Sequence, residues 1–119
     1  MKNTLTKSET RNLRNYTRVL HNLTKCVTFR PDGRIRRTPE LNAALHAVVL
    51  ADDKFITPPD KWGDFHCVRN EVWFKYCAIL SRFAKKSPVN ARLVNLIEND
   101  IYIHRRALRA AYDLAHACK

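Results

Sequence analysis

The sequence DFHCVRNEVWFKYCAILSRFA, residues 64–84, carries the strongest structural signal in this chain. Its apolar residues recur at steps of three and four, which is the spacing of one face of an α-helix, and further apolar residues widen this stripe around the middle turn. We therefore expect a helix that starts with Asp64 as its N-cap, lies in the centre of a bundle and supplies packing surface rather than chemistry. The stripe consists of Phe65, Val68, Val72, Tyr76, Ile79 and Phe83, flanked by Trp73, Phe74, Cys77, Ala78 and Leu80.

Capping signals predict a first helix that begins at Thr6. In Thr6-Lys7-Ser8-Glu9 the threonine hydroxyl can accept from the Glu9 amide, and the Glu9 carboxylate can accept from the Thr6 amide, which is the capping-box arrangement. The apolar residues that follow recur at steps of three and four, so the helix is expected to run to about Cys26. They are Leu13, Tyr16, Leu20, Leu23 and Val27.

Two further helix starts combine a hydroxyl N-cap with proline at the first helical position. Thr38-Pro39 opens a helix expected to end at residues 52–54, and Ser87-Pro88 opens a stripe that continues to the C-terminus. One helix of about thirty residues would be long, so we slightly favour a break at Asn99-Asp100, with Asp100 capping the second part. Whether residues 88–118 form one helix or two is left open by the sequence.

These signals together predict an all-α fold, a compact bundle of four to five helices in one domain covering residues 1–119. Pro31-Asp32-Gly33 is a strong turn signal between two short segments that can pair, so a short basic hairpin or an ordered loop is expected after the first helix. Residues 52–63 are the only candidate linker, flexible or extended, and residues 56–60 within them are expected to be extended because residues before proline avoid the helical conformation.

The charge of the chain is its most unusual property. Twenty-two Lys and Arg against eleven Asp and Glu give a net charge of +11, and the calculated pI is 10.0. The first forty residues hold ten basic and three acidic residues, a net charge of +7, which leaves +4 for the other seventy-nine. A protein this basic is expected to meet a polyanion such as nucleic acid, an anionic membrane surface or an acidic protein. The skew places the expected binding face in the N-terminal third.

Three groups of cations are the candidate binding residues. The first helix carries a row at steps of three and four, about 200° from its apolar stripe and about 21 Å long. The segment after it is the most cationic part of the chain, and a weaker third cluster lies near the C-terminus, where nearby carboxylates can pair with it. The groups are Arg11, Arg14, Arg18, His21 and Lys25; Arg30, Arg34, Arg36 and Arg37; and Arg105, Arg106 and Arg109.

Other functional classes have little support in the sequence. No apolar segment is long enough to span a bilayer and no signal peptide is visible, so we expect a soluble, cytoplasmic protein. The cysteines lack the pattern of a disulfide framework and are expected to be free thiols, with Cys67 and Cys77 as small buried hydrophobic residues. The zinc-ligand spacings, glycine-rich phosphate loop and nucleophile motifs are missing, so we predict no metal, no cofactor and no enzymatic activity. His66, or His104 with Arg105, would be the catalytic candidates, but His104 lies on an apolar stripe and is interpreted as a satisfied or semi-buried histidine.

The sequence therefore predicts a small, non-enzymatic nucleic-acid-binding protein that lays its first helix and residues 34–37 against phosphates. Duplex DNA or structured RNA is favoured over a single strand because most aromatic residues lie on apolar stripes, with Phe29 and Tyr102 as exceptions. The alternative is a protein-interaction module, an inhibitor or adaptor like some compact basic proteins of phages and plasmids, that docks on an acidic surface of a nucleic-acid-processing machine. The wide apolar surface of residues 64–84 also leaves a homodimer open.

Overall fold

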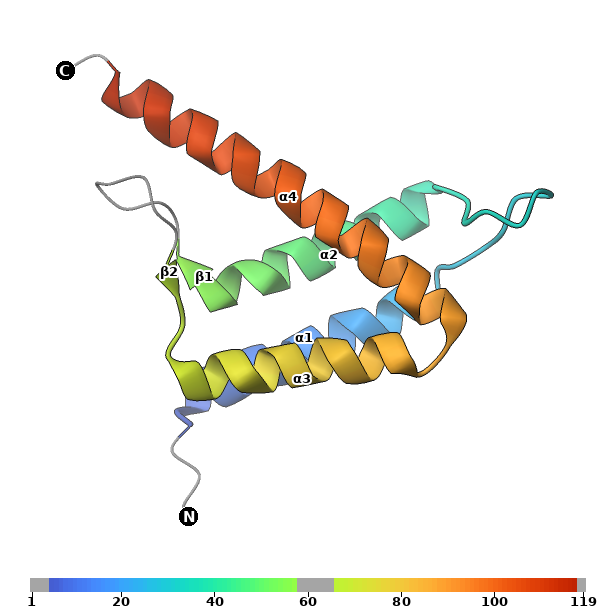
Figure 1. Ribbon diagram of the computed structural model, residues 1–119, viewed down its shortest axis with the longest axis horizontal. Helices are drawn as coiled ribbons and strands as arrows, with labels where there is room; N and C mark the ends of the chain where they lie inside the picture. Colours follow the sequence, from blue (N-terminus) through green and yellow to red (C-terminus); the bar gives the residue numbers. More distant parts are fainter. Residues whose placement is uncertain (1–4, 58–65, 118–119) are drawn as a thin grey trace.

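Four α-helices make up most of the part of the chain that the structure describes, which confirms the predicted all-α fold (Figure 1). The computed structural model describes residues 5–57 and 66–117. A short 3₁₀ helix and a two-stranded antiparallel pair of two residues each lie between the second and third helices. The elements in order are α1 (Lys7–Thr24), α2 (Pro39–Asp52), η1 (Asp53–Phe55), β1 (Ile56–Thr57), β2 (His66–Cys67), α3 (Asn70–Lys85) and α4 (Pro88–His116).

Three of the predicted N-caps, Thr6, Thr38 and Ser87, are confirmed. At α1 the Glu9 amide donates to the Thr6 hydroxyl at 3.0 Å, and the Thr6 amide donates to the Glu9 carboxylate at 2.9 Å. At α2 the Thr38 hydroxyl accepts from the Leu41 amide at 3.1 Å, and at α4 Ser87 accepts from the amide of residue 90 at 3.1 Å. Each cap satisfies an N–H that the first helical turn leaves without a partner, which fixes where these helices begin.

The helices form a thin body of 52 × 46 × 18 Å, so each of them keeps one face toward solvent. α2 packs between α1 and α4, and α3 packs beside α1 and against α4. α3 and α4 meet at the turn around Ser87 and diverge from there, so the C-terminal half of α4 extends away from α3 (Figure 1). The most deeply buried core side chains are Tyr16, Leu20, Leu23, Leu41, Leu45, Val48, Phe55, Val72, Leu93 and Ile97.

The prediction that residues 64–84 form a central helix is wrong in two respects. α3 begins at Asn70, because residues 66–67 pair with β1 and the Val68 amide donates to the Phe55 carbonyl at 3.1 Å, which holds this stretch extended. α3 is also peripheral, since it buries only one flank of its wide apolar stripe and leaves Phe74 68% exposed. The predicted Asp64 cap and half of the predicted linker, residues 58–63, lie outside the described residues. In the described half, residues 52–55 are helical and only residues 56–57 are extended.

The favoured break at Asn99-Asp100 is also absent, and α4 runs unbroken for 29 residues. Its buried positions Leu93, Ile97 and Ile101 continue across the proposed break on one face, so packing supports the helix there. The Asp100 carboxylate, which was expected to cap a second helix, instead forms an ion pair with Arg37 at 3.5 Å.

The basic segment after α1 is a short hairpin, one of the two alternatives left open. Phe29 and Ile35 form an antiparallel bridge, and the Arg30 amide donates to the Arg34 carbonyl at 2.7 Å. Gly33 adopts a φ of +84°, a conformation that glycine reaches without a steric penalty and other residues rarely adopt.

Three cysteines lie within the described residues, and all are free thiols, as predicted. The prediction that Cys67 and Cys77 are buried is wrong, because Cys67 in β2 and Cys77 in α3 are both exposed. Among the described helices, none combines the length and the hydropathy that a membrane span requires.

Candidate nucleic-acid interface

The predicted row of cations lies on the solvent face of α1. Arg11, Arg14 and Arg18 are exposed, while the apolar residues between them point into the core. Within the described residues no carboxylate forms an ion pair with any of the three arginines, and Arg18 donates only to the side-chain oxygen of Asn15, at 2.5 Å. The row is therefore open to an external anion.

The one carboxylate of α1 is engaged elsewhere. Glu9 accepts from the Arg69 guanidinium through both of its oxygens, at 2.6 and 2.8 Å, just before α3 begins. These hydrogen bonds, together with the one from the Thr6 amide, lower the pKa of Glu9 from 4.5 to about 2. Arg69 also donates to Glu71, the one acidic residue of α3, at 2.9 Å. The acidic residues of both helices thus gather at their N-terminal ends, away from the cations.

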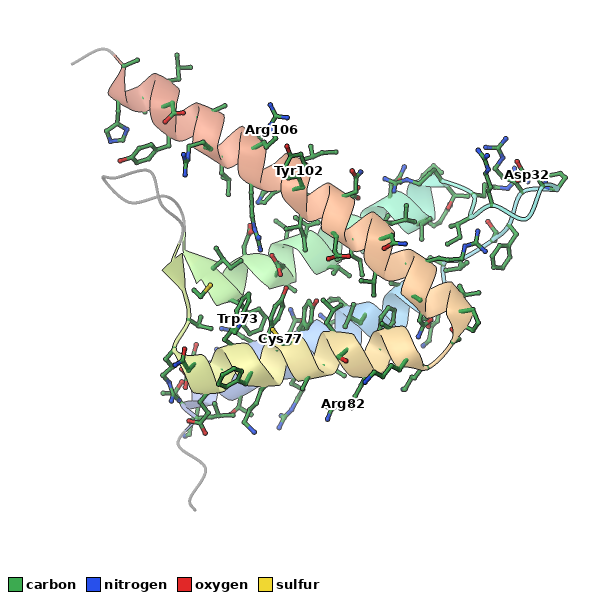
Figure 2. All side chains as sticks on the ribbon, viewed as in Figure 1. Asp32, Trp73, Cys77, Arg82, Tyr102 and Arg106 are labelled. Atoms are coloured by element: carbon green, nitrogen blue, oxygen red, sulfur yellow. The ribbon has the colours of Figure 1, made fainter. Side chains whose placement is uncertain are left out.

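α3 adds a second set of cations that the sequence analysis did not select. α1 and α3 run side by side in the same direction, with the Glu9–Arg69 pair at their N-terminal ends (Figure 1). Lys75, Arg82 and Lys86 are exposed and form no ion pair with a described carboxylate. Figure 2 shows Arg82 pointing away from the body of the protein.

A groove of about 840 Å³ separates the C-terminal halves of these two helices. Its floor is apolar and includes Leu20, Ile79 and Phe83, while His21, Arg82 and Lys86 contribute its basic groups. None of the described residues that line it is acidic. The α1/α3 basic face is the name we give to the surface formed by cations of α1 and its C-cap together with cations of α3 and its C-cap. These are Arg11, Arg14, Arg18, His21 and Lys25, and Lys75, Arg82 and Lys86.

The hairpin arginines are less available than the cations of α1. Asp32 lies at the hairpin turn and forms ion pairs with Arg30 at 3.6 Å and with Arg34 at 3.9 Å, while Arg37 pairs with Asp100. Arg36 is exposed and has no ion pair within the described residues. Figure 2 shows Asp32 at the far tip of the hairpin, well separated from Arg82. Exposed pairs of this kind are worth only about 0–1 kcal/mol, so an external phosphate can compete with them.

The hairpin is held in place by an arginine of α4. Arg92 donates to the Gly33 carbonyl at 3.0 Å, and its guanidinium lies 5.8 Å from the centre of the Phe29 ring. Phe29 is 45% exposed, as its position off the apolar stripes indicated. This cation–π contact already occupies one face of a ring that a base could stack on.

The C-terminal arginines lie on another part of the molecule and have structural partners. Arg105 donates to Asp52 at 2.9 Å, and the hydroxyl of Tyr76 donates to the other oxygen of this buried carboxylate. Burial raises the pKa of Tyr76 above its ordinary value, so the hydroxyl keeps its proton. Arg109 is half-buried and lines a groove between α3 and α4. Neither arginine belongs to the α1/α3 basic face.

No group of three or more metal-ligating side chains occurs within the part of the chain that the structure describes. His104 is half-buried and its Nε2 lies 2.8 Å from Asp53 Oδ2, so it is semi-buried and has a hydrogen-bond partner, as predicted. The expectation that the protein has no enzymatic activity stays a prediction.

Comparisons with protein-family models, with curated proteins and with solved structures found no match for this chain.

Proposed function

We propose that the protein binds nucleic acid without catalysing a reaction, and that the α1/α3 basic face lies along the phosphate backbone. The observation that supports this most strongly is positive charge without internal compensation on two adjacent helices. Arg14 and Arg18 of α1 and Arg82 of α3 all lack a carboxylate partner among the described residues. An ordinary exposed helix face mixes charges of both signs, so this segregation favours an external polyanion.

The dimensions of the face suit a phosphate backbone. From Arg11 to Lys25 the row is about 21 Å long, which corresponds to about six nucleotide steps of one B-form strand at about 3.4 Å per step. Arginine offers forked N–H donors that match phosphate oxygens, and it remains charged at any physiological pH. Phosphates follow one another at the same spacing whatever the base sequence, and a row of cations on one helix can match that spacing. We therefore propose contacts to the backbone rather than readout of bases.

The aromatic residues favour duplex DNA or structured RNA over a single strand. A single-strand platform stacks successive bases on several exposed rings. The one aromatic residue of α1, Tyr16, is fully buried, and Phe83 at the floor of the groove is only 8% exposed. Phe74 of α3 is exposed, but one ring beside a row of cations makes a weak stacking surface.

Fluorescence anisotropy with labelled duplex DNA, duplex RNA and single strands tests this proposal across a salt series. The test variant replaces Arg11, Arg14 and Arg18 with alanine. The matched control replaces Arg36, Lys54 and Arg106, which are exposed outside the α1/α3 basic face, and so removes the same charge. Each lost phosphate contact should lower the slope of log K against log salt by about 0.9 for a duplex.

We expect the α1 variant to lower that slope by about two to three units and the control variant by less than about one. Equal losses in the two variants would mean that only net charge matters, and the α1/α3 basic face would then not be a site. If the wild-type protein binds none of these nucleic acids near physiological salt, the proposal that it binds nucleic acid is refuted. The basic face would then be assigned to an acidic protein surface, the alternative that the sequence leaves open.

A further inference from the structure

A second groove, of about 700 Å³, lies between α3 and the C-terminal half of α4. Its floor is apolar and includes Trp73, Leu80 and Ile101. Figure 2 shows Trp73 and Cys77 on the side of α3 that faces α4. This surface is separate from the α1/α3 basic face, and its role does not depend on the proposed function.

The shape of the groove favours an elongated occupant. On α4 the lining residues extend from Ile97 to Asp113, a length of about 24 Å at 1.5 Å per residue. The two walls are helices that diverge from the turn at Ser87 (Figure 1). A wedge between two diverging helices is filled by a third helix, and about 24 Å is the length of roughly four helical turns. A compact ligand would cover only part of it.

The charges of the groove indicate what that helix carries. Arg105, Arg106 and Arg109 lie within about two turns at the middle of the α4 wall, whereas Glu98 and Asp113 lie toward its ends. Arg105 is engaged by Asp52, but Arg106 is exposed. The one hydrogen bond that Arg106 makes within the described residues is a long one, 3.5 Å, to the Tyr102 hydroxyl. The middle of the groove therefore favours carboxylates next to the apolar stripe of its occupant.

A second copy of this chain does not match that description. α1 and α3 carry more Lys and Arg than Asp and Glu, as does α4. α2 has only Glu40, at its first turn, and Asp52, which is buried against Arg105. Two chains with a net charge of +11 each would also repel one another. Among the described helices, none offers an apolar stripe flanked by carboxylates.

We propose that the α3/α4 groove is a docking site for an amphipathic helix of an acidic partner protein, with its apolar stripe on Trp73 and Leu80 and its carboxylates facing Arg106. A helix that binds in a groove in this way contacts it through apolar residues spaced three and four apart in its sequence. The docked helix then packs against the part of α4 that extends away from α3.

A phage-displayed library of helical peptides, selected on the full chain, tests the proposal. We expect the recovered peptides to share apolar residues at helical spacing and Asp or Glu beside them. Two variants of adjacent exposed residues of α4 provide the matched comparison. Ala110→Glu places a carboxylate in the groove, whereas Ala111→Glu places the same charge on the same helix outside the lining.

Labelled peptides from the selection should bind about tenfold more weakly to Ala110→Glu and within about twofold of wild type to Ala111→Glu, as measured by fluorescence anisotropy. In Arg106→Glu the affinity should fall, and lysine in place of the peptide carboxylates should restore it. The proposal would be overturned if the peptides bound equally to Ala110→Glu and Ala111→Glu, or if the selected peptides showed no helical spacing of apolar residues.

Two further results would also overturn it in favour of another occupant. A wild-type dimer in sedimentation velocity that Ala110→Glu dissociates would assign the groove to a second copy. A loss of nucleic-acid affinity in Ala110→Glu that Ala111→Glu does not share would assign it to nucleic acid. Because neither variant touches the α1/α3 basic face, failure here leaves the proposed function intact.

Discussion

Replacing Asp52 with alanine should destabilise the protein much more than replacing the adjacent Asp53. Asp52 is 1% exposed at the end of α2, and it accepts hydrogen bonds from the Tyr76 hydroxyl and from Arg105 at 2.9 Å. Asp53 keeps 35% of its side chain exposed and has one partner, His104, at 2.8 Å. The two carboxylates are neighbours in sequence, so the comparison isolates burial and partner number.

The expected magnitudes follow from these environments. Removing one member of a buried ion pair costs roughly 3–5 kcal/mol of unfolding free energy because the remaining charge loses its compensation. The Arg105 side chain is 32% exposed and can recover part of its hydration, so the lower end of this range, about 3 kcal/mol, is expected for Asp52→Ala. For Asp53→Ala the loss should be about 0–1 kcal/mol, the usual value of a solvent-accessible pair.

Urea unfolding followed by far-UV circular dichroism measures both values, and thermal unfolding provides a second reading. For a chain of this length about 1 kcal/mol corresponds to roughly 3–6 °C, so Asp52→Ala should lower Tm by at least about 9 °C and Asp53→Ala by less than about 6 °C. Asp52→Asn, which keeps an acceptor for Tyr76, should fall between them. If the two alanine variants differ by less than about 1 kcal/mol, the Asp52 network does not fasten α2 to α3 and α4, and the reasoning is refuted.

Two smaller perturbations test other parts of the fold. Gly33→Ala should destabilise the protein by about 1 kcal/mol in urea unfolding, because the φ of +84° is unfavourable for alanine although there is open space for its Cβ; an unchanged or higher stability would contradict the hairpin geometry. The carboxyl of Glu9 should titrate with a pKa of about 2 in NMR and return toward 4.5 in Arg69→Ala. The pKa of Glu9 is lower in the folded state than in the unfolded state. The stability that Glu9 adds relative to Glu9→Gln should therefore be fully present above about pH 4.5 and disappear as the pH falls through about 2. A stability difference between wild type and Glu9→Gln that stays constant from about pH 4.5 to about 2 would exclude the Arg69 contact as the source of that stability.

The parts of the fold that local chemistry determines were predictable from the sequence. The caps at Thr6, Thr38 and Ser87 depend on hydroxyls and prolines within four residues of each helix start, so the sequence was sufficient to locate them. The start of α3 was not predictable in this way. Residues 66–67 lie within the stretch in which the apolar spacing predicts a helix, but they pair with β1, a segment about ten residues away in the chain, and that contact overrides the helical pattern.

The candidate site was predictable in part for a related reason. The exposed row on α1 follows from its amphipathic spacing, which a single helix reveals. The contribution of α3 does not, because Lys75, Arg82 and Lys86 become part of the α1/α3 basic face only when α3 lies beside α1. A signal was present, since these cations repeat with Ile79 at steps of four, three and four, but it resembles an ordinary solvated face until the neighbouring helix is known.

The distribution of the acidic residues explains why the basic face carries so much uncompensated charge. Carboxylates fasten one element to another: Glu9 joins α1 to the start of α3 through Arg69, Asp52 joins α2 to α4, and Asp100 joins α4 to the hairpin. Each lies at a contact between elements, whereas the cations of α1 and α3 lie on their outer surfaces. Repulsion among these cations opposes folding, and one carboxylate placed among them would relieve it. The described parts of this face contain no such carboxylate, and under the proposed function a bound polyanion would relieve the repulsion instead. The segregation of charge, more than its total, is therefore the observation that supports the proposal.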